Sequence, residues 1–291
     1  MEKTKKSKHK KLYLNRSKGG NFAIFFFLTL VGLFMVLPLV YAISNSLKPL
    51  NELWVYPPRF FVENPTLSNF KDIFSLMTDS WVPFSRYLAN TLTVAVIGTG
   101  GHVIISSICA YALAKHDFPG KEFLFKIVVL SLMFSTAVTA VPLFLVMSKL
   151  NLIDSLWSMI LPAFCSSLGL YLMKQFMETN IPDALIESAH IDGANEWTVF
   201  WKLVMPLVKP AWLTLVIFSF QSLWNVGANS YIRSEELKTL NYALAQIVSG
   251  GIARQGAAAA ATVVMMLLPI LVFVVTQSNV VETVASSGMK D

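Results

Sequence analysis

Residues 187–206 read ESAHIDGANEWTVFWKLVMP, and this polar, charged stretch lies between two long apolar runs of the chain. A polar insert of this length between membrane helices must lie in water, because charged and unpaired polar groups are costly in hydrocarbon. Its pattern predicts two short helices separated by Gly193. An exposed helical hairpin of this kind favours a docking element for a soluble partner, although a hairpin that only links two spans fits the same pattern.

The composition predicts a membrane protein. Of the 291 residues, 55% are hydrophobic and 14% are charged, and the mean hydropathy is +0.58. This balance does not suit a single soluble core. Apolar runs of about 20 residues recur, and each is long enough, as a helix, to cross the roughly 30 Å of hydrocarbon in a bilayer. We therefore expect an all-α polytopic membrane protein.

Six apolar segments are expected to form transmembrane helices. They cover approximately residues 22–47, 87–114, 123–149, 156–177, 207–227 and 257–281. The first segment is too long for the apolar region of a signal peptide, and no small-residue cleavage site follows it. We therefore expect it to remain as a membrane anchor.

The positive charge of the chain is concentrated near its N-terminus. Residues 1–18 hold eight Lys and Arg and one acid, a charge of +7, whereas the whole chain carries +6. A basic tail beside an apolar segment is the positive-inside signal for a cytoplasmic end, and it also suits anionic lipid headgroups. No nucleic-acid partner is expected, because the tail has almost no aromatic interleaving and no fold around it.

The charge of the loops sets the expected topology. Lysines lie in or beside the loops 115–122 and 178–206, whereas loop 48–86 is mixed in charge. With six spans, both termini are expected in the cytoplasm. The expected parts are a basic cytoplasmic tail 1–21, a transmembrane helix 22–47, an extracytoplasmic loop 48–86, a five-helix core 87–281 that carries a cytoplasmic loop at 178–206, and a cytoplasmic tail 282–291.

The expected extracytoplasmic loop 48–86 is rich in proline and aromatic residues, and a short amphipathic helix is expected near 67–77. Two interpretations stay open: the aromatic side chains anchor the loop at the membrane surface, or the loop receives an extracytoplasmic partner. The two cysteines, Cys109 and Cys165, fall inside apolar runs. They predict neither a disulfide framework nor a metal site.

The polar stretch carries its own start and stop signals. Pro182 and Asp183 suit the first turn of a helix, with Thr179 or Asn180 as a candidate cap. Gly193 is expected to end that helix, and Asn195 to cap a second one. Pro206 marks the turn into the next apolar run.

The stretch resembles the cytoplasmic signature loop of ABC-importer permeases, which reads Glu-Ala-Ala, three residues, Gly, nine residues, Ile, one residue, Leu-Pro. Glu187, Ala189, Gly193 and Pro206 stand in register with that pattern. The chain departs from it modestly, with Ser188 for Ala, Leu for Ile at 203 and Met for Leu at 205. The resemblance implies the type I importer permease fold and a coupling loop at 178–206 that docks on an ATPase. The implied coupling residues are Glu187, Ser188, Ala189, Asp192, Gly193 and Pro206.

Further stretches are similar to the carbohydrate branch of this family, of maltose type. They are AYALAK at 110–115, FPGK at 118–121, LYLMKQF at 170–176, IDGA at 191–194 and WN at 224–225. The resemblance implies a multi-pass subunit of the bacterial plasma (inner) membrane that passes a carbohydrate. It implies as partners a second homologous permease, two cytoplasmic ATP-binding subunits and an extracytoplasmic solute-binding protein, besides membrane lipid.

Chemistry within the chain itself is not expected. The sequence has no G-x-x-x-x-G-K-[ST] phosphate loop, no His, Cys, Asp and Glu cluster with metal-ligand spacing, and no apparent nucleophile–base pair. ATP and Mg are therefore expected on the partner ATPase, with no cofactor or metal in this chain and no catalytic residue.

A sugar pathway needs hydroxyl and amide partners and aromatic faces. Six residues of suitable type are candidates for its lining: Asn90, His102, Tyr171, Gln221, Trp224 and Asn225. A lone intramembrane histidine also commonly satisfies a neighbouring carbonyl group, so that interpretation of His102 stays open. Three other functions stay open as well: an ABC importer of a non-sugar solute, an ion-coupled secondary carrier, and a membrane scaffold without transport.

Overall fold

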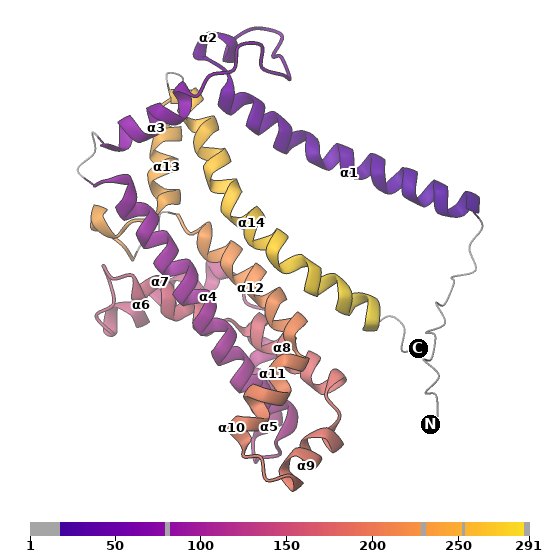
Figure 1. The fold of residues 1–291 in the computed structure, drawn as a ribbon. Coiled ribbons are helices and arrows are strands. Elements are labelled where there is room, and N and C mark those ends of the chain that lie inside the picture. The colour runs from indigo at the N-terminus through magenta and orange to yellow at the C-terminus, as the bar shows by residue number, and fades with distance from the viewer. Residues whose placement is uncertain (1–17, 79–81, 228–230, 252–253, 288–291) are drawn as a thin grey trace, which may run out of the picture.

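The structure is a computed structural model and describes residues 18–78, 82–227, 231–251 and 254–287. All regular secondary structure in these ranges is helical (Figure 1). The elements are α1 (Lys18–Leu47), α2 (Leu50–Leu53), α3 (Ser68–Thr78), α4 (Phe84–Lys115), α5 (Lys121–Ser131), α6 (Thr136–Lys149), α7 (Trp157–Phe164), α8 (Ser167–Asn180), α9 (Asp183–Ile191), α10 (Glu196–Thr198), η1 (Val199–Val204), α11 (Met205–Leu207), α12 (Lys209–Trp224), η2 (Glu235–Leu237), α13 (Leu240–Ser249) and α14 (Gln255–Ser287).

Several of these helices can cross a bilayer. The stretches Gly19–Leu47, Phe84–Lys115 and Gln255–Gln277 are each long and apolar enough to do so as single helices. Two further pairs qualify only as bent spans. The chain bends by 113° between α5 and α6, and by 77° between the segment Glu196–Leu207 and α12. The chain is therefore an all-helical, polytopic membrane protein.

Two of the expected spans are not continuous helices, and this corrects the sequence-based assignment. The segment 123–149 is divided into α5 and α6, and the segment 156–177 is divided into α7 and α8. The backbone becomes extended at Ser135 before α6 and at Ser166 before α8. Both breaks consist of small or apolar residues, so hydropathy carries no signal for them.

The described helices extend into both expected tails. Helix α14 continues to Ser287, so residues 282–287 of the expected C-terminal tail are helical. Helix α1 begins at Lys18, within the expected basic tail. The remainder of both expected tails, residues 1–17 and 288–291, lies outside the described residues. The expected helix near 67–77 is present as α3.

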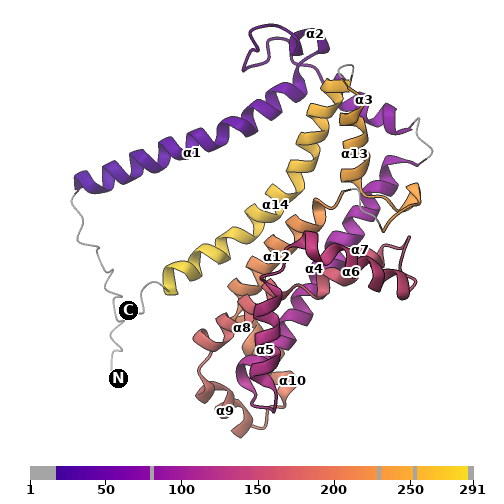
Figure 2. The ribbon, with the colours of Figure 1, turned by 180° about the vertical axis from the view of Figure 1, so that it is seen from behind.

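Helix α4 is the centre of the packed body. It packs against α7, α8, α12 and α13, and the two opposite views show it running the full height of the body (Figures 1 and 2). We call its two ends the α3 end, at Phe84, and the α9 end, at Lys115. Three buried apolar clusters follow its length: one around Tyr87 and Ile73 at the α3 end, one around Trp224 in the middle, and one around Tyr111 at the α9 end.

Helix α1 stands apart from this body. It contacts α3 and α14 near its C-terminal end, and then diverges from α14 in both views (Figures 1 and 2). Its side chains are exposed or half-buried from Gly19 to Ile43, and the first buried one is Ser44. Apolar surface of this extent requires lipid or another protein around it.

Candidate functional site

The polar stretch forms a helical hairpin at the α9 end of the body. Helix α9 starts after Pro182, and the backbone at Gly193 has φ +82°, a conformation that favours glycine. Asn195 then caps the second helix, because its Oδ1 accepts a hydrogen bond from the Thr198 N–H at 2.8 Å. The sequence-based expectation of helix, glycine and helix is confirmed.

Two local details differ from expectation. Thr179 and Asn180 do not cap α9, since both side chains bond backward to carbonyls of α8. The second helix is α-helical only over α10 and continues as the π-helix η1 before α11. The Thr and Asn were predicted as caps because of their type, but α8 continues to Asn180 and uses them at its own C-terminal end.

The hairpin presents one side to the body and the other to its surroundings. Ile186 is buried in the apolar cluster of the α9 end, and Ala189 is half-buried beside it. The other predicted coupling residues are exposed, namely Glu187, Ser188, Asp192, Gly193 and Pro206. These residues therefore lie on a surface that a partner can reach.

Large apolar side chains lie on the same hairpin, and the sequence analysis did not single them out. Ile191 is 86% exposed, and Trp197 and Trp201 are also exposed. Exposed apolar groups beside a turn are typical of a protein contact. Their position within eight residues of Gly193 is the sequence signal that could have indicated this surface.

Helix α4 holds the hairpin by polar contacts at two points. Lys115 donates from Nζ to the Ile181 carbonyl oxygen at 2.6 Å and to Asp183 Oδ1 at 2.7 Å. Tyr111 donates its hydroxyl to Glu196 Oε2 at 2.9 Å. The hydrogen bond from Lys115 and its positive charge lower the pKa of Asp183 below its usual range.

A cavity of about 480 Å³ lies midway along the body, between α4, the α7–α8 break and α12. Of the six predicted pathway residues, His102 lines it. Its imidazole is buried, and Nδ1 lies 3.3 Å from Ser106 Oγ. Hydroxyl groups line the remaining polar part of the wall, from Thr136, Ser166, Ser219 and Ser222.

The other five predicted pathway residues lie elsewhere. Tyr171 stacks on Phe125, with ring centroids 6.0 Å apart. Gln221 on α12 and Asn225, which directly follows α12, are exposed, and Asn225 Nδ2 donates to the Gln221 carbonyl oxygen at 2.8 Å. Trp224 is only 1% exposed, and its Nε1–H donates to the Met265 carbonyl oxygen at 2.9 Å. The pathway assignment therefore stays a prediction, and His102 is the member that lines this cavity.

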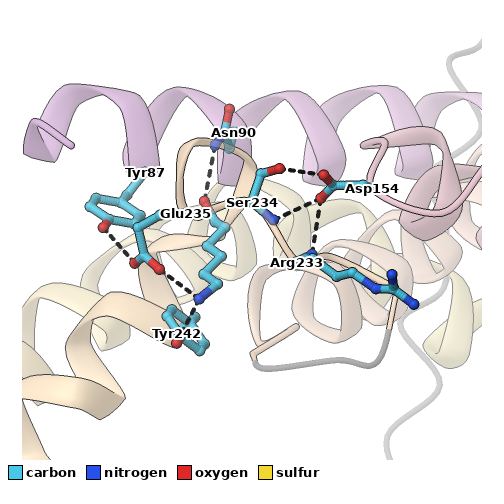
Figure 3. A network of polar contacts seen from close by, with 8 residues as sticks. Tyr87, Asn90, Asp154, Arg233, Ser234, Glu235 and Tyr242 are labelled. Carbon is cyan, nitrogen blue, oxygen red and sulfur yellow. Dashed lines mark hydrogen bonds and ion pairs between the residues drawn. The ribbon is translucent and has the colours of Figure 1, made fainter. Parts of the chain in front are cut away.

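The remaining candidate, Asn90, belongs to a polar network at the α3 end (Figure 3). Its Nδ2 donates to the carbonyl oxygens of Glu236 at 2.7 Å and Lys238 at 3.0 Å. One helical turn earlier, the Tyr87 hydroxyl donates to Glu235 Oε1 at 2.8 Å. Asn90 thus joins α4 to the segment 231–240.

Asp154 holds the same segment from another direction (Figure 3). Its carboxylate accepts the backbone N–H groups of Arg233 at 2.9 Å and Ser234 at 2.8 Å, and also the Ser234 hydroxyl. These hydrogen bonds lower the pKa of Asp154 below its usual range, those from Ser234 most of all. The sequence carries no local signal for this contact, because Asp154 lies 79 and 80 residues from Arg233 and Ser234.

Among the described ranges, no group of three or more His, Cys, Asp and Glu side chains has the geometry to hold a metal ion. The geometry instead combines an exposed helical hairpin, a largely apolar cavity with hydroxyl groups and an imidazole in its wall, and a long apolar helix beside the body. Such an arrangement suits docking and passage of a solute rather than bond-breaking chemistry.

The chain is similar to transport proteins in sequence. Residues 102–284 match the family described as binding-protein-dependent transport system inner membrane component. The polygalacturonan/rhamnogalacturonan transport system permease protein YtcP of Bacillus subtilis is 33% identical over 235 residues, which are 80% of this chain and 79% of that protein. The sulfoquinovosyl glycerol transport system permease protein SmoH of Agrobacterium fabrum is 31% identical over 258 residues, which are 87% of this chain and 88% of that protein.

The fold is also similar to a solved structure. A chain of a bacterial ABC transporter involved in the import of the acidic polysaccharide alginate superposes with a TM-score of 0.75 at 23% identity. The match covers 90% of this chain and 98% of that chain.

Proposed function

The chain belongs to the family of binding-protein-dependent transport system inner membrane components, and from this premise we propose that it is a permease subunit of an ATP-driven carbohydrate importer. Relatives that align along about four fifths of its length or more are permeases whose names specify sugar or polysaccharide transport. One observation supports its role as the subunit that contacts the ATPase: the hairpin of α9, α10 and η1 is exposed at one end of the body. The chain is not itself an enzyme.

The proposed complex contains three kinds of protein partner. A second, homologous permease completes the pathway, and two cytoplasmic ATP-binding subunits hold ATP and Mg. A solute-binding protein delivers the carbohydrate from outside. The chain then lies in the bacterial plasma (inner) membrane with the hairpin and both termini in the cytoplasm, as its basic N-terminal tail favours.

The exposed face of α9 is the proposed contact with the ATP-binding subunit. Glu187 offers a carboxylate to a basic group, and Ile191 offers apolar area near the turn at Gly193. ATP binding can drive transport only if it favours one conformation of the complex over the other. In this proposal the hairpin transmits the conformational change of the ATP-binding subunit to the membrane-spanning helices.

The cavity beside His102, a largely apolar space with four hydroxyl side chains in its wall, is the proposed part of the carbohydrate pathway in this chain. Sugar hydroxyls both donate and accept hydrogen bonds, and serine and threonine hydroxyls and an imidazole can match either role. Ser219→Ala with Ser222→Ala is expected to reduce uptake of the carbohydrate while the complex still assembles. Unchanged uptake by this variant would remove the cavity from the pathway.

The test of the proposed function uses the full complex, purified through this chain and reconstituted in liposomes. The wild type is expected to co-purify with an ATP-binding subunit and a second permease, and to take up carbohydrate only with ATP and the binding protein. Glu187→Lys is expected to lose the ATP-binding subunit and the uptake, but to keep the second permease. Glu122→Lys, an exposed reversal of charge in the first turn of α5, is the matched control and is expected to keep both.

The same preparation distinguishes the alternative functions. An ion-coupled carrier would take up solute without ATP and would stop when an uncoupler collapses the ion gradient. A scaffold would recruit the partner through the hairpin but move no solute. Either result would overturn the proposed function.

A further inference from the structure

Lys115, at the last turn of α4, is a buried cation in contact with the hairpin. Its side chain is 5% exposed, whereas its partner Asp183 is 80% exposed. Nζ donates to the carboxylate of Asp183, the first residue of α9, and to the carbonyl oxygen of Ile181, which precedes α9. The lysine therefore fixes the position at which α8 ends and α9 starts.

Tyr111 makes the second contact, one turn earlier on α4. Its hydroxyl donates to Glu196, the first residue of α10. Two imidazoles flank the same carboxylate, with His190 Nε2 at 3.3 Å and His116 Nε2 at 3.5 Å. The start of the second helix of the hairpin is thus tied to α4 and to the end of α9.

These two contacts differ in kind from the rest of the interface. The hairpin also packs on the body through apolar side chains, including Ile186, Val199 and Phe200. Apolar packing holds the hairpin to the body but gives little direction, because the hydrophobic effect is non-directional. Hydrogen bonds to the starts of both hairpin helices fix how the hairpin is oriented against α4.

Helix α4 extends from these contacts through the whole body without a break. It spans Phe84–Lys115 and packs on α7, α8 and α12 on the way. A continuous packed helix transmits a displacement of one end to the other, whereas the divided helices α5–α6 and α7–α8 can bend at their breaks.

We infer that Lys115 and Tyr111 are the positioning residues through which a movement of the hairpin is transmitted to α4. The inference rests on the proposed function, since it assumes that an ATP-binding subunit moves the hairpin. Beyond the proposed function, it names the two side chains and the helix, α4, to which the movement of the hairpin is transmitted. Loss of these contacts should leave docking and ATP hydrolysis in place but separate them from transport.

The test measures uptake per ATP hydrolysed in liposomes that contain the full complex. Lys115→Met and Tyr111→Phe each remove one polar contact and keep most of the apolar volume. Each is expected to lower the ratio of uptake to hydrolysis by roughly 2- to 30-fold, the range for residues inside a coupling network. Lys115→Arg keeps a cation that can reach both oxygens and is expected to restore most of the ratio.

The matched control is Lys174→Met. Lys174 is also a largely buried lysine, and its Nζ pairs with Glu178 at 2.6 Å. Both residues belong to α8, so this ion pair does not join α4 to the hairpin. A structural role for any buried lysine would lower the ratio equally in Lys115→Met and Lys174→Met, and that result would overturn the inference. Co-purification of the ATP-binding subunit confirms that each variant is assembled.

The outcomes separate this inference from the proposed function. If the wild type takes up solute without ATP, the proposed function fails before any variant is measured. If the wild type needs ATP and both α4 variants keep the wild-type ratio, the proposed function stands and the inference is overturned. Should Lys115→Met not assemble, Tyr111→Phe, which removes a single oxygen, decides the outcome by its ratio.

Discussion

Polar contacts hold both ends of α4, but the two sets of contacts differ in the free energy that is lost when they break. At the α3 end, the buried Asn90 and Thr91 bond to backbone groups of the segment 236–240. At the α9 end, Lys115 and Tyr111 bond mainly to the carboxylates of exposed residues. A buried backbone group that loses its partner carries the full desolvation penalty, whereas an exposed carboxylate is rehydrated by water.

This difference suits one end for anchoring and the other for movement. We expect the α3 end to keep the segment 231–240 on α4. At the α9 end, Asp183 and Glu196 are exposed and water can replace their partners, so we expect these contacts to break more easily when a partner moves the hairpin. The same helix thus combines a stable attachment with an adjustable one.

The largest effect is expected at the α3 end, for Asn90→Leu. The variant leaves the carbonyl oxygens of Glu236 and Lys238 without their donor. The expected loss is roughly 1–3 kcal/mol of stability. Thermal unfolding of the purified chain in detergent measures it. A midpoint equal to that of the wild type would contradict the proposed anchoring.

A smaller loss of stability is expected at the α9 end, for Lys115→Met. Lys115 is 5% exposed, but its partner carboxylate on Asp183 is 80% exposed and is rehydrated by water when the lysine is removed, and apolar packing of the hairpin remains. The thermal midpoint should therefore fall less than in Asn90→Leu, although transport is affected more. A lower unfolding temperature for Lys115→Met than for Asn90→Leu would contradict the proposed difference in stability between the two ends of α4.

The α3 end is expected to loosen in acid because of Asp154. The folded-state pKa of this carboxyl lies below its unfolded value, so its contribution to stability is present above the unfolded pKa and is lost as the pH falls through the folded pKa. The protection of the Arg233 and Ser234 amides, measured as their exchange rate relative to the intrinsic rate at the same pH, should fall over that acidic range. In Asp154→Asn this change should be absent, with protection already low at neutral pH.

The smallest effect is expected in the middle of α4, for Thr99→Val. Within the described ranges, the buried Thr99 hydroxyl has no hydrogen-bond partner, in contrast to the polar groups at both ends. Replacing it with an isosteric methyl group is expected to leave stability unchanged or slightly raised. A clear loss of stability in the thermal unfolding experiment would reveal a hidden polar contact there and weaken the contrast with the ends.

Sequence reasoning succeeded where the signal is local. The cap at Asn195 and the turn at Gly193 depend on residues within a few positions, and the structure has both. The length of α4 followed from apolar composition over a single run. These features need no knowledge of what lies across the fold.

The same reasoning could not find features that depend on distant residues or on a break without a polar signal. Tyr87 and Glu235 are 148 positions apart, and no periodicity links them. The division of α5 from α6 lies within apolar and small residues, so hydropathy predicts one span. Trp224 was selected for the pathway by residue type, but its burial beside α14 depends on packing that type alone does not encode.

The isolation of α1 has a consequence for how the sequence can diverge. From Gly19 to Ile43 its side chains are not buried by the rest of this chain, so internal packing imposes almost no selection there. Selection on these positions comes from the surrounding lipid or from a neighbouring subunit. Substitutions in α1 should therefore follow changes in the neighbouring subunit or the lipid, and should be independent of substitutions at the buried positions of α4.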